Sequence, residues 1–197
     1  MITMELLTTA AIVLFASLIK GSTGFGFSMS ALPLLALQLP VKMAIPMITI
    51  WSLTTSLIIV LQKKEYKVTG EHNAIIVWGA LGTVAGTLFL ARINEHFIVV
   101  ITAILFALLT ILSLAGVELK VKNRRRATMR TGIISGILAG SISLSGPPVT
   151  LLLNALKTTK EEFREIFARF DMFTSTVAII GFVIAGLVDF NLVKQAL

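Results

Sequence analysis

Two segments rich in glycine and serine interrupt otherwise apolar stretches, and together they have the chemistry of an anion site. The first reads GSTGFGF at residues 21–27, and the second reads GSISLSGPP at residues 140–148. Glycine permits close backbone approach, and proline starts a helix more readily than it continues one. We therefore expect a broken helix at each segment, restarting over about residues 27–39 and 148–156. The free N–H groups and positive dipole end of each restarted helix would attract an anion.

Side chains in and beside these segments extend this interpretation, because serine and threonine hydroxyls donate hydrogen bonds to oxyanion oxygens. Ser28 and Ser30 are further donors of this kind. The alternative is that each segment is only a packing kink or a glycine contact between helices. The candidate substrate-binding residues are Lys20, Gly21, Ser22, Thr23, Gly24, Gly26, Ser141, Ser143, Ser145, Gly146 and Pro147.

Two charged residues fall within predicted membrane segments, where an unpaired charge is costly. Lys20 lies at the predicted tip of the first hairpin and could neutralise a bound anion; alternatively, it extends to water at an interface. Asp171 lies in the last apolar run and could carry a proton or a coupling charge. Alternatively, Asp171 pairs with a neighbouring arginine or lysine.

The two segments belong to a weak internal repeat with an offset of 119 residues. Paired broken helices in two halves are typical of a transporter's binding site. The offset relates Asp171 to Ser52, and the hydroxyl groups that follow each of these residues either face a central cavity or bond to their own helix carbonyls. Residues that match at this offset are Gly21 and Gly140, Ser22 and Ser141, Leu34 and Leu153, Ala36 and Ala155, Leu37 and Leu156, Thr55 and Thr174, and Ser56 and Ser175.

The composition indicates an integral membrane protein, because 56% of the residues are hydrophobic and only 14% are charged. Four apolar runs, at residues 43–61, 73–91, 97–117 and 166–188, approach or exceed the roughly 20 residues that cross a bilayer. We therefore expect a multi-pass protein of the inner cell membrane, with the lipid bilayer as its surroundings.

The positive charges predict the orientation. Basic residues gather at residues 62–72, 118–130 and 157–169, which should face the cytoplasm, whereas residues 40–42 and 92–96 should be external. Topology thus explains the net charge of +7 better than nucleic-acid binding does.

The resulting fold is an all-α polytopic membrane protein with two inverted repeats, each opening with a re-entrant or broken-helix hairpin. The first repeat, residues 1–117, comprises a hairpin and three spans. Residues 118–130 form a basic cytoplasmic loop. The second repeat, residues 131–197, comprises a hairpin and one span, so it is incomplete relative to the first.

Other residue types point away from catalysis and cofactors. The chain has no cysteine, and His72 and His96 fall in predicted loops on opposite sides without a second metal ligand nearby. An intramembrane enzyme would need a nucleophile beside a base, and no such pair is visible. The spacing of Gly132, Gly136 and Gly140 predicts a smooth helix face for close packing, as does that of Gly82 and Gly86.

The two glycine-rich segments resemble the paired signatures of the sulfite exporter TauE/SafE family. This resemblance implies a bacterial or archaeal inner-membrane permease with two inverted halves that moves sulfite, organosulfonates or related anions, usually outward. The sequence departs from the family at Ser143 and Ser145, where members often have glycine. The chain is also too short for the seven or eight spans that are usual in the family. The family's motif maps onto Gly21, Gly24, Gly26, Gly140, Gly146 and Pro147.

These observations predict a secondary transporter that exports a small anion, in which two hairpin tips meet near the midplane. No nucleotide-binding loop is visible, so an ion gradient or the anion's own gradient would drive transport. A homodimer is possible. The alternative is a non-transporting subunit for membrane assembly or biogenesis.

Overall fold

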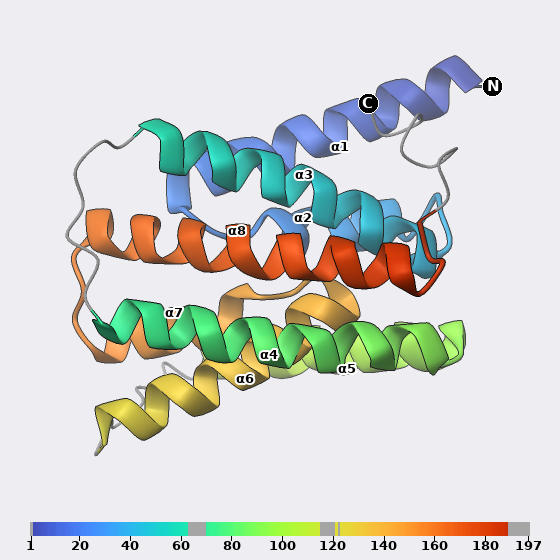
Figure 1. Cartoon of the computed structure of the whole chain (residues 1–197). Coiled ribbons are helices and arrows are strands. Elements are labelled where there is room, and N and C mark those ends of the chain that lie inside the picture. Colours follow the sequence, from blue (N-terminus) through green and yellow to red (C-terminus); the bar gives the residue numbers. More distant parts are fainter. Residues whose placement is uncertain (1, 63–69, 115–120, 122, 189–197) are drawn as a thin grey trace.

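The computed structural model describes residues 2–62, 70–114, 121 and 123–188, and within these ranges its regular secondary structure is entirely α-helical, without strands (Figure 1). Helices satisfy their own backbone hydrogen bonds, as lipid requires. The eight helices are α1 Ile2–Thr23, α2 Phe27–Leu35, α3 Val41–Gln62, α4 Gly70–Arg92, α5 Glu95–Leu114, α6 Arg124–Ile142, α7 Gly146–Ala155 and α8 Lys160–Ile184.

Among the described residues, four helices are long and apolar enough to cross a membrane, namely Leu6–Thr23 in α1, Val41–Gln62, Asn73–Arg92 and Lys160–Ile184. Three of these match predicted spans, whereas α1 was expected to form only part of a hairpin. The run predicted at residues 97–117 lies mostly in α5, a helix of 20 residues, and its last three residues are outside the described residues.

Large apolar side chains on the outside of the bundle fit lipid surroundings. Leu14 is 66% exposed and Leu61 is 70% exposed. Such a surface would be unfavourable in water, so the chain is a multi-pass membrane protein.

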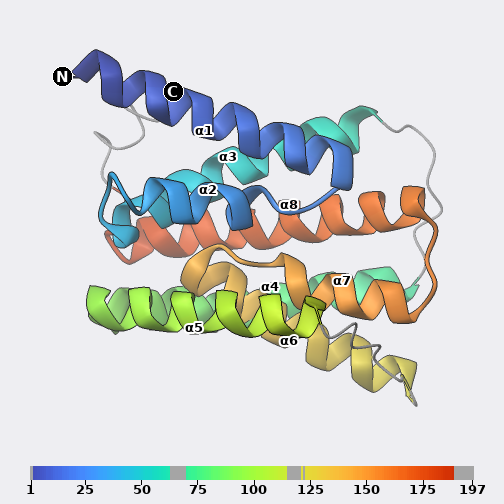
Figure 2. The same cartoon turned by 180° about the vertical axis from the view of Figure 1, so that it is seen from behind.

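Two pairs of helices form hairpins that point in opposite directions. α1 and α2 meet at the non-helical residues 24–26, and α6 and α7 meet at residues 143–145. Figures 1 and 2 show that the first hairpin's tip points toward the end of the bundle where α8 begins, and the second hairpin's tip points the other way. Residues 143–145 of the second hairpin are buried, whereas in the first hairpin Gly24 is buried and the next two residues are half-buried.

Helix boundaries recur with the offset found in the sequence. α1 ends at Thr23 and α6 at Ile142, while α3 begins at Val41 and α8 at Lys160; both differences are 119 residues. The residue after each first helix is left-handed, with φ of 88° at Gly24 and 58° at Ser143. The sequence repeat therefore coincides with a repeat of local structure.

Glycines bring α4 and α6 into close contact, as their spacing predicted. A Cβ atom added at Gly136 would collide with the carbonyl oxygen of Gly79, and one at Gly82 would collide with that of Ile133. Gly140 meets the carbonyl of Thr83 in the same way. The absence of side chains thus allows the two helix backbones to touch.

The loops predicted to be external lie at one end of the bundle. The backbone N–H of Lys42 lies 3.5 Å from Oε1 of Glu95, which joins the start of α3 to the start of α5. The first turns of α8, with Lys160 and Arg164, lie at the opposite end (Figure 1).

Candidate functional site

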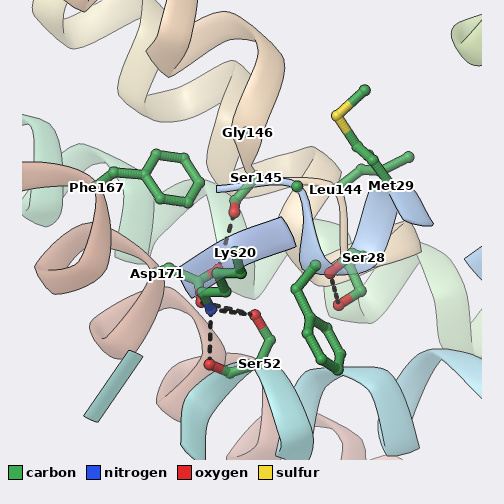
Figure 3. Close-up of a pocket in the computed structure, with 12 residues that line it drawn as sticks. Lys20, Ser28, Met29, Ser52, Leu144, Ser145, Gly146, Phe167 and Asp171 are labelled. Carbon is green, nitrogen blue, oxygen red and sulfur yellow. Dashed lines mark hydrogen bonds and ion pairs between the residues drawn. The ribbon is translucent and has the colours of Figure 1, made fainter. Parts of the chain in front are cut away.

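A buried ion pair joins the first hairpin to α8. The Nζ atom of Lys20, in the last turn of α1, lies 2.7 Å from Oδ2 of Asp171, and their side chains are only 1% and 7% exposed. Lys20 Nζ also donates to the carbonyl oxygen and the hydroxyl of Ser52, each at 2.8 Å (Figure 3). An ammonium group has three donors, so these three acceptors satisfy it completely.

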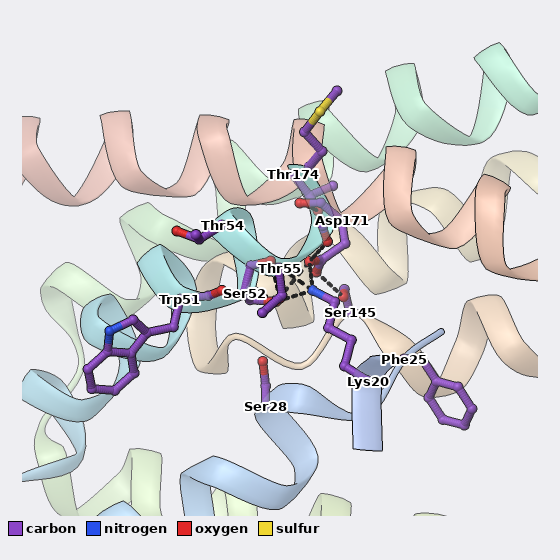
Figure 4. A network of polar contacts seen from close by, with 12 residues as sticks. Lys20, Phe25, Ser28, Trp51, Ser52, Thr54, Thr55, Ser145, Asp171 and Thr174 are labelled. Atoms are coloured by element: carbon purple, nitrogen blue, oxygen red, sulfur yellow. Dashed lines mark hydrogen bonds and ion pairs between the residues drawn. The ribbon is translucent and has the colours of Figure 1, made fainter. Parts of the chain in front are cut away.

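The Asp171 carboxylate is equally well satisfied. Its Oδ2 atom accepts hydrogen bonds from Ser52 Oγ at 2.8 Å and Ser56 Oγ at 2.7 Å, besides the bond from Lys20. Its Oδ1 atom accepts from Ser145 Oγ at 3.0 Å. Figure 4 shows α1, α3, α8 and the second break converging on this carboxylate. Such hydrogen bonds offset the cost of burying the two charges.

Asp171 and Ser52, the residue of α3 that bonds to both charges, lie halfway along α8 and α3. Ser52 is eleven residues after Val41 and ten before Gln62, and Asp171 is eleven after Lys160 and thirteen before Ile184. At about 1.5 Å per residue, the pair is about 15–20 Å from either helix end. This is about half the thickness of a bilayer's hydrocarbon core.

A second group of hydroxyls links the two hairpins. Ser28, in the first turn of α2, lies 3.3 Å from the hydroxyl of Ser143 in the second break. Thr49 Oγ1, on α3, lies 3.0 Å from the same Ser143 hydroxyl. Hydroxyls can exchange partners by rotating, so this cluster can adapt to a guest molecule.

The ion pair and the hydroxyl cluster border one small pocket. Its walls include Lys20, Ser28, Ser143, Ser145 and Asp171, and its volume is about 10 Å³ (Figure 3). That is about the space of one water molecule. The pocket is therefore closed to a larger anion in this conformation.

The pocket also lies at two helix starts. Neither Gly26 before α2 nor Ser145 before α7 makes a side-chain capping bond. Phe27, Ser28 and Gly146 follow these caps and line the pocket. The positive dipole ends of two helices therefore face the same small space.

Some predicted site residues lie at this pocket, and others do not. The pocket is lined by Lys20, Gly26, Ser143, Ser145 and Gly146, while Gly24 packs against Arg164. Gly21, Ser22, Thr23, Ser141 and Pro147 are not among the residues that line it.

The reason is that both helices continue further than expected. Gly21 and Gly140 are helical, so the breaks begin three residues later, and Lys20 lies in the last turn of α1 rather than at the hairpin tip. Ser22 Oγ lies 3.0 Å from the carbonyl oxygen of Leu18, and Ser141 Oγ donates to that of Ile137. Their hydroxyl groups are occupied by their own helices.

Lys20 and Asp171 pair with each other, and not with a bound anion or with a neighbour in the sequence. Lys20 is not a free cation awaiting an anion, because Asp171 neutralises it. Asp171 does pair with a lysine, but with one 151 positions away in the sequence. The nearby Arg169 instead pairs with Glu165 at 2.8 Å.

The hydroxyl-rich stretch of α3 serves both of the roles considered for it. Ser52 and Ser56 bond to Asp171, while Thr54 points away and bonds to the carbonyl oxygen of Ile50 (Figure 4). Thr49, which sequence reasoning missed, is also at the site. The repeat offset could have indicated part of this arrangement, since Ser52 and Asp171 are 119 residues apart and share a hydrogen bond.

Three aromatic rings lie between this pocket and a larger cavity. Phe25, between the two glycines of the first break, contacts Phe163 and Phe167 with ring centroids 5.7 and 6.0 Å apart. Phe167 lines the small pocket, whereas Phe25 and Phe163 line a cavity of about 640 Å³. The rings thus form a thin apolar partition between the two spaces.

The fold and site are those of a multi-pass membrane protein with a polar centre built from broken helices. The family of the sulfite exporter TauE/SafE matches residues 9–196, and the chain belongs to this family. It is a family of membrane transporters for sulfite and related anions. No curated protein and no solved structure was found to match the chain.

Proposed function

We propose that this protein exports a small oxyanion, such as sulfite or an organosulfonate, across the inner cell membrane through the pocket at Lys20 and Asp171. The observation that carries the proposal is the position of this ion pair, buried halfway along α3 and α8 and between two broken-helix hairpins. A buried charge pair at this depth is costly to maintain and typical of a transport pathway.

An entering anion would take the place of Asp171 beside Lys20. The ammonium would then pair with the anion, and the hydroxyls of Ser28, Ser143 and Ser145 would bind its oxygens. The starts of α2 and α7 add their dipoles. Every group needed for a small oxyanion is present, but the pocket must widen to admit one.

Charge balance suggests how protons couple to this movement. In the closed pocket, Lys20 and Asp171 sum to zero charge. With a monovalent anion bound and Asp171 protonated, the sum is again zero, so neither state moves a net charge through the apolar core. The anion and one proton therefore move in the same direction, driven by the anion's own gradient.

The aromatic partition of Phe25, Phe163 and Phe167 would be the closed gate on one side. Phe25 stands between Gly24 and Gly26, whose φ angles of 88° and 90° favour glycine. A change in this break would move the Phe25 ring and join the pocket to the larger cavity. Opening of the other side would then release the anion, as alternating access requires.

Counterflow of labelled sulfite in proteoliposomes tests the proposal. We expect saturable counterflow by the wild-type chain and a fall of about ten- to a hundredfold in Asp171→Asn, on the scale of one charged hydrogen-bonded contact. Ser145→Ala retains both charges and tests the same site if Asp171→Asn does not fold. Arg125→Gln, at an exposed position on α6, is the control.

A pH-sensitive dye trapped inside sulfite-loaded vesicles would report the accompanying proton during net efflux of sulfite into sulfite-free buffer. Absence of counterflow with both sulfite and organosulfonates, by protein shown to be folded, would refute the proposed transport. Net efflux of sulfite without movement of protons would refute only the role of Asp171.

A further inference from the structure

A second cavity, of about 640 Å³, lies at the end of the bundle where α8 begins. Its walls come from the end of α1, the end of α7 and the first turn of α8, and they include Ser22, Asn154, Lys160, Glu161 and Arg164. This volume is typical of a site for a small molecule, and none of these side chains belongs to the pocket at Lys20.

Arg164 is held in this wall by the first break. The Cα and Cγ atoms of Arg164 lie 3.1 Å from the position of a Cβ atom added at Gly24, so the first break and α8 are tightly packed at this point. The Nε atom of Arg164 is buried and has no hydrogen-bond partner in the part of the chain that the structure describes. A buried donor without an acceptor is unfavourable, and a rotation of the Arg164 side chain toward the cavity would let an anion there supply the acceptor.

The cavity favours a negative guest. Lys160 and Arg164 contribute two positive charges against the one negative charge of Glu161. The hydroxyls of Ser22 and Thr23 are already bonded to carbonyl groups of α1. The groups free to donate are thus chiefly the two cations and the side-chain amide of Asn154, and a guanidinium binds oxyanions through two parallel hydrogen bonds.

The position of the cavity suits a waiting site for the transported anion. Phe167 lines the pocket at Lys20 and contacts Phe25 and Phe163, which form part of the wall of this cavity. The positive-inside rule places the basic start of α8 on the cytoplasmic side. An exporter collects its substrate from that side.

We propose that this cavity is a second oxyanion site, with Arg164 as its principal ligand, at which the substrate binds before it passes the aromatic gate. This inference rests on the proposed function for the identity of its ligand. It adds a binding step, and a residue to test, outside the ion-pair pocket.

Sulfite titrated into the purified full-length chain, with binding followed by calorimetry, tests this site. A maltoside detergent carries no phosphate, so sulfite is then the only oxyanion present. We expect Arg164→Gln to weaken sulfite binding by about ten- to a hundredfold, the scale of one charge-assisted contact. Arg164→Lys should lose less, because it keeps the charge but not the paired hydrogen bonds. Arg125→Gln, which removes the same charge from an exposed position on α6, should bind as the wild type does.

Equal affinities for Arg164→Gln and Arg125→Gln, with both variants folded, would overturn the proposal. So would binding at Arg164 of an anionic phospholipid but not of sulfite, because the cavity would then hold a lipid headgroup. If Arg164→Gln does not fold, Arg164→Lys decides the matter: unchanged affinity and an unchanged binding enthalpy contradict a guanidinium ligand.

The two proposals fail in distinguishable ways. Sulfite bound at Arg164 by a chain that shows no counterflow supports this site and contradicts the proposed transport. Counterflow that depends on Asp171 but is indifferent to Arg164, with unchanged sulfite binding, supports transport and contradicts this site.

Discussion

The first and second breaks share a backbone arrangement but differ in chemistry. In both, a left-handed residue, Gly24 or Ser143, follows the end of a long helix. In both, a short helix then runs back toward the end of the bundle from which the long helix came (Figure 1). The first break has glycine at residues 24 and 26, whereas the second has hydroxyls at Ser143 and Ser145. The backbone arrangement is repeated in the two breaks, whereas the side chains differ.

The charges show the same contrast. At the repeat offset, Lys20 corresponds to the buried Ala139, and Asp171 corresponds to Ser52. Each half therefore contributes one member of the ion pair and an uncharged residue at the matching place. Had both halves kept the same charge, like charges would face each other in the interior, at high cost. Because the two halves differ at these positions, one lysine and one aspartate form a single site without net charge.

The largest expected effect comes from breaking the ion pair on one side only. Lys20→Met leaves the Asp171 carboxylate buried without its cation, and we expect a loss of about 3–5 kcal/mol in the free energy of unfolding. The double variant Lys20→Met with Asp171→Leu removes both charges and should recover much of that loss. Denaturant unfolding in detergent measures both variants. A single variant as stable as the wild type would show that water reaches the carboxylate.

A smaller effect on stability is expected at the glycines between α4 and α6, and it should be absent at a glycine that makes no such contact. Gly136→Ala would push a methyl group into the carbonyl of Gly79, so we expect a loss of about 1–3 kcal/mol from overpacking of α4 against α6. Gly21→Ala is the matched control, because nothing lies within 4 Å of its added Cβ. Alanine should stabilise α1 there by about 0.5–1 kcal/mol. Thermal unfolding of the two variants should shift in opposite directions; shifts of the same sign contradict this packing.

The smallest expected effect on stability comes from Ser143→Gly, which gives the second break the glycine that the first break has at Gly24. Ser143→Gly relieves a left-handed backbone, by about 1–2 kcal/mol, but removes the hydroxyl that meets Ser28 and Thr49, at a cost of about 1 kcal/mol. The two terms nearly cancel in stability. Sulfite counterflow should nevertheless require a higher sulfite concentration for half-maximal rate, because one anion donor is lost.

Thr54→Ala is the control for this variant, since its hydroxyl bonds only to its own helix and points away from the site. An unchanged half-maximal concentration in Ser143→Gly, matching that of Thr54→Ala, would remove Ser143 from the binding site.

Much of the site can be anticipated from the residues alone. The offset of 119 residues places Ser52 and Asp171 at matching positions of the two halves, and these two residues bond to each other. Lys20, Ser143, Ser145 and Asp171 each stand out in the sequence for their chemistry. The glycine spacing on α4 and α6 predicts close packing, and this is confirmed.

The misplaced residues have a common physical reason. The sequence pattern predicts breaks at Gly21 and Gly140, but isolated glycines are tolerated inside a helix that is otherwise well packed. The helices end only where a left-handed residue reverses the chain, at Gly24 and Ser143. As a result, Ser22 and Ser141 bond to their own helices instead of facing the pocket.

The sequence by itself determined the membrane class, the two glycine-rich breaks and the residues able to bind an anion, because composition and local backbone preference act over short distances. Only the tertiary structure decided that Lys20 meets Asp171 and that three phenylalanine rings divide the pocket from the cavity at Arg164. Those contacts join α1 to α8 across most of the chain. Their partners are selected by the packing of whole helices, which no local pattern of residues specifies.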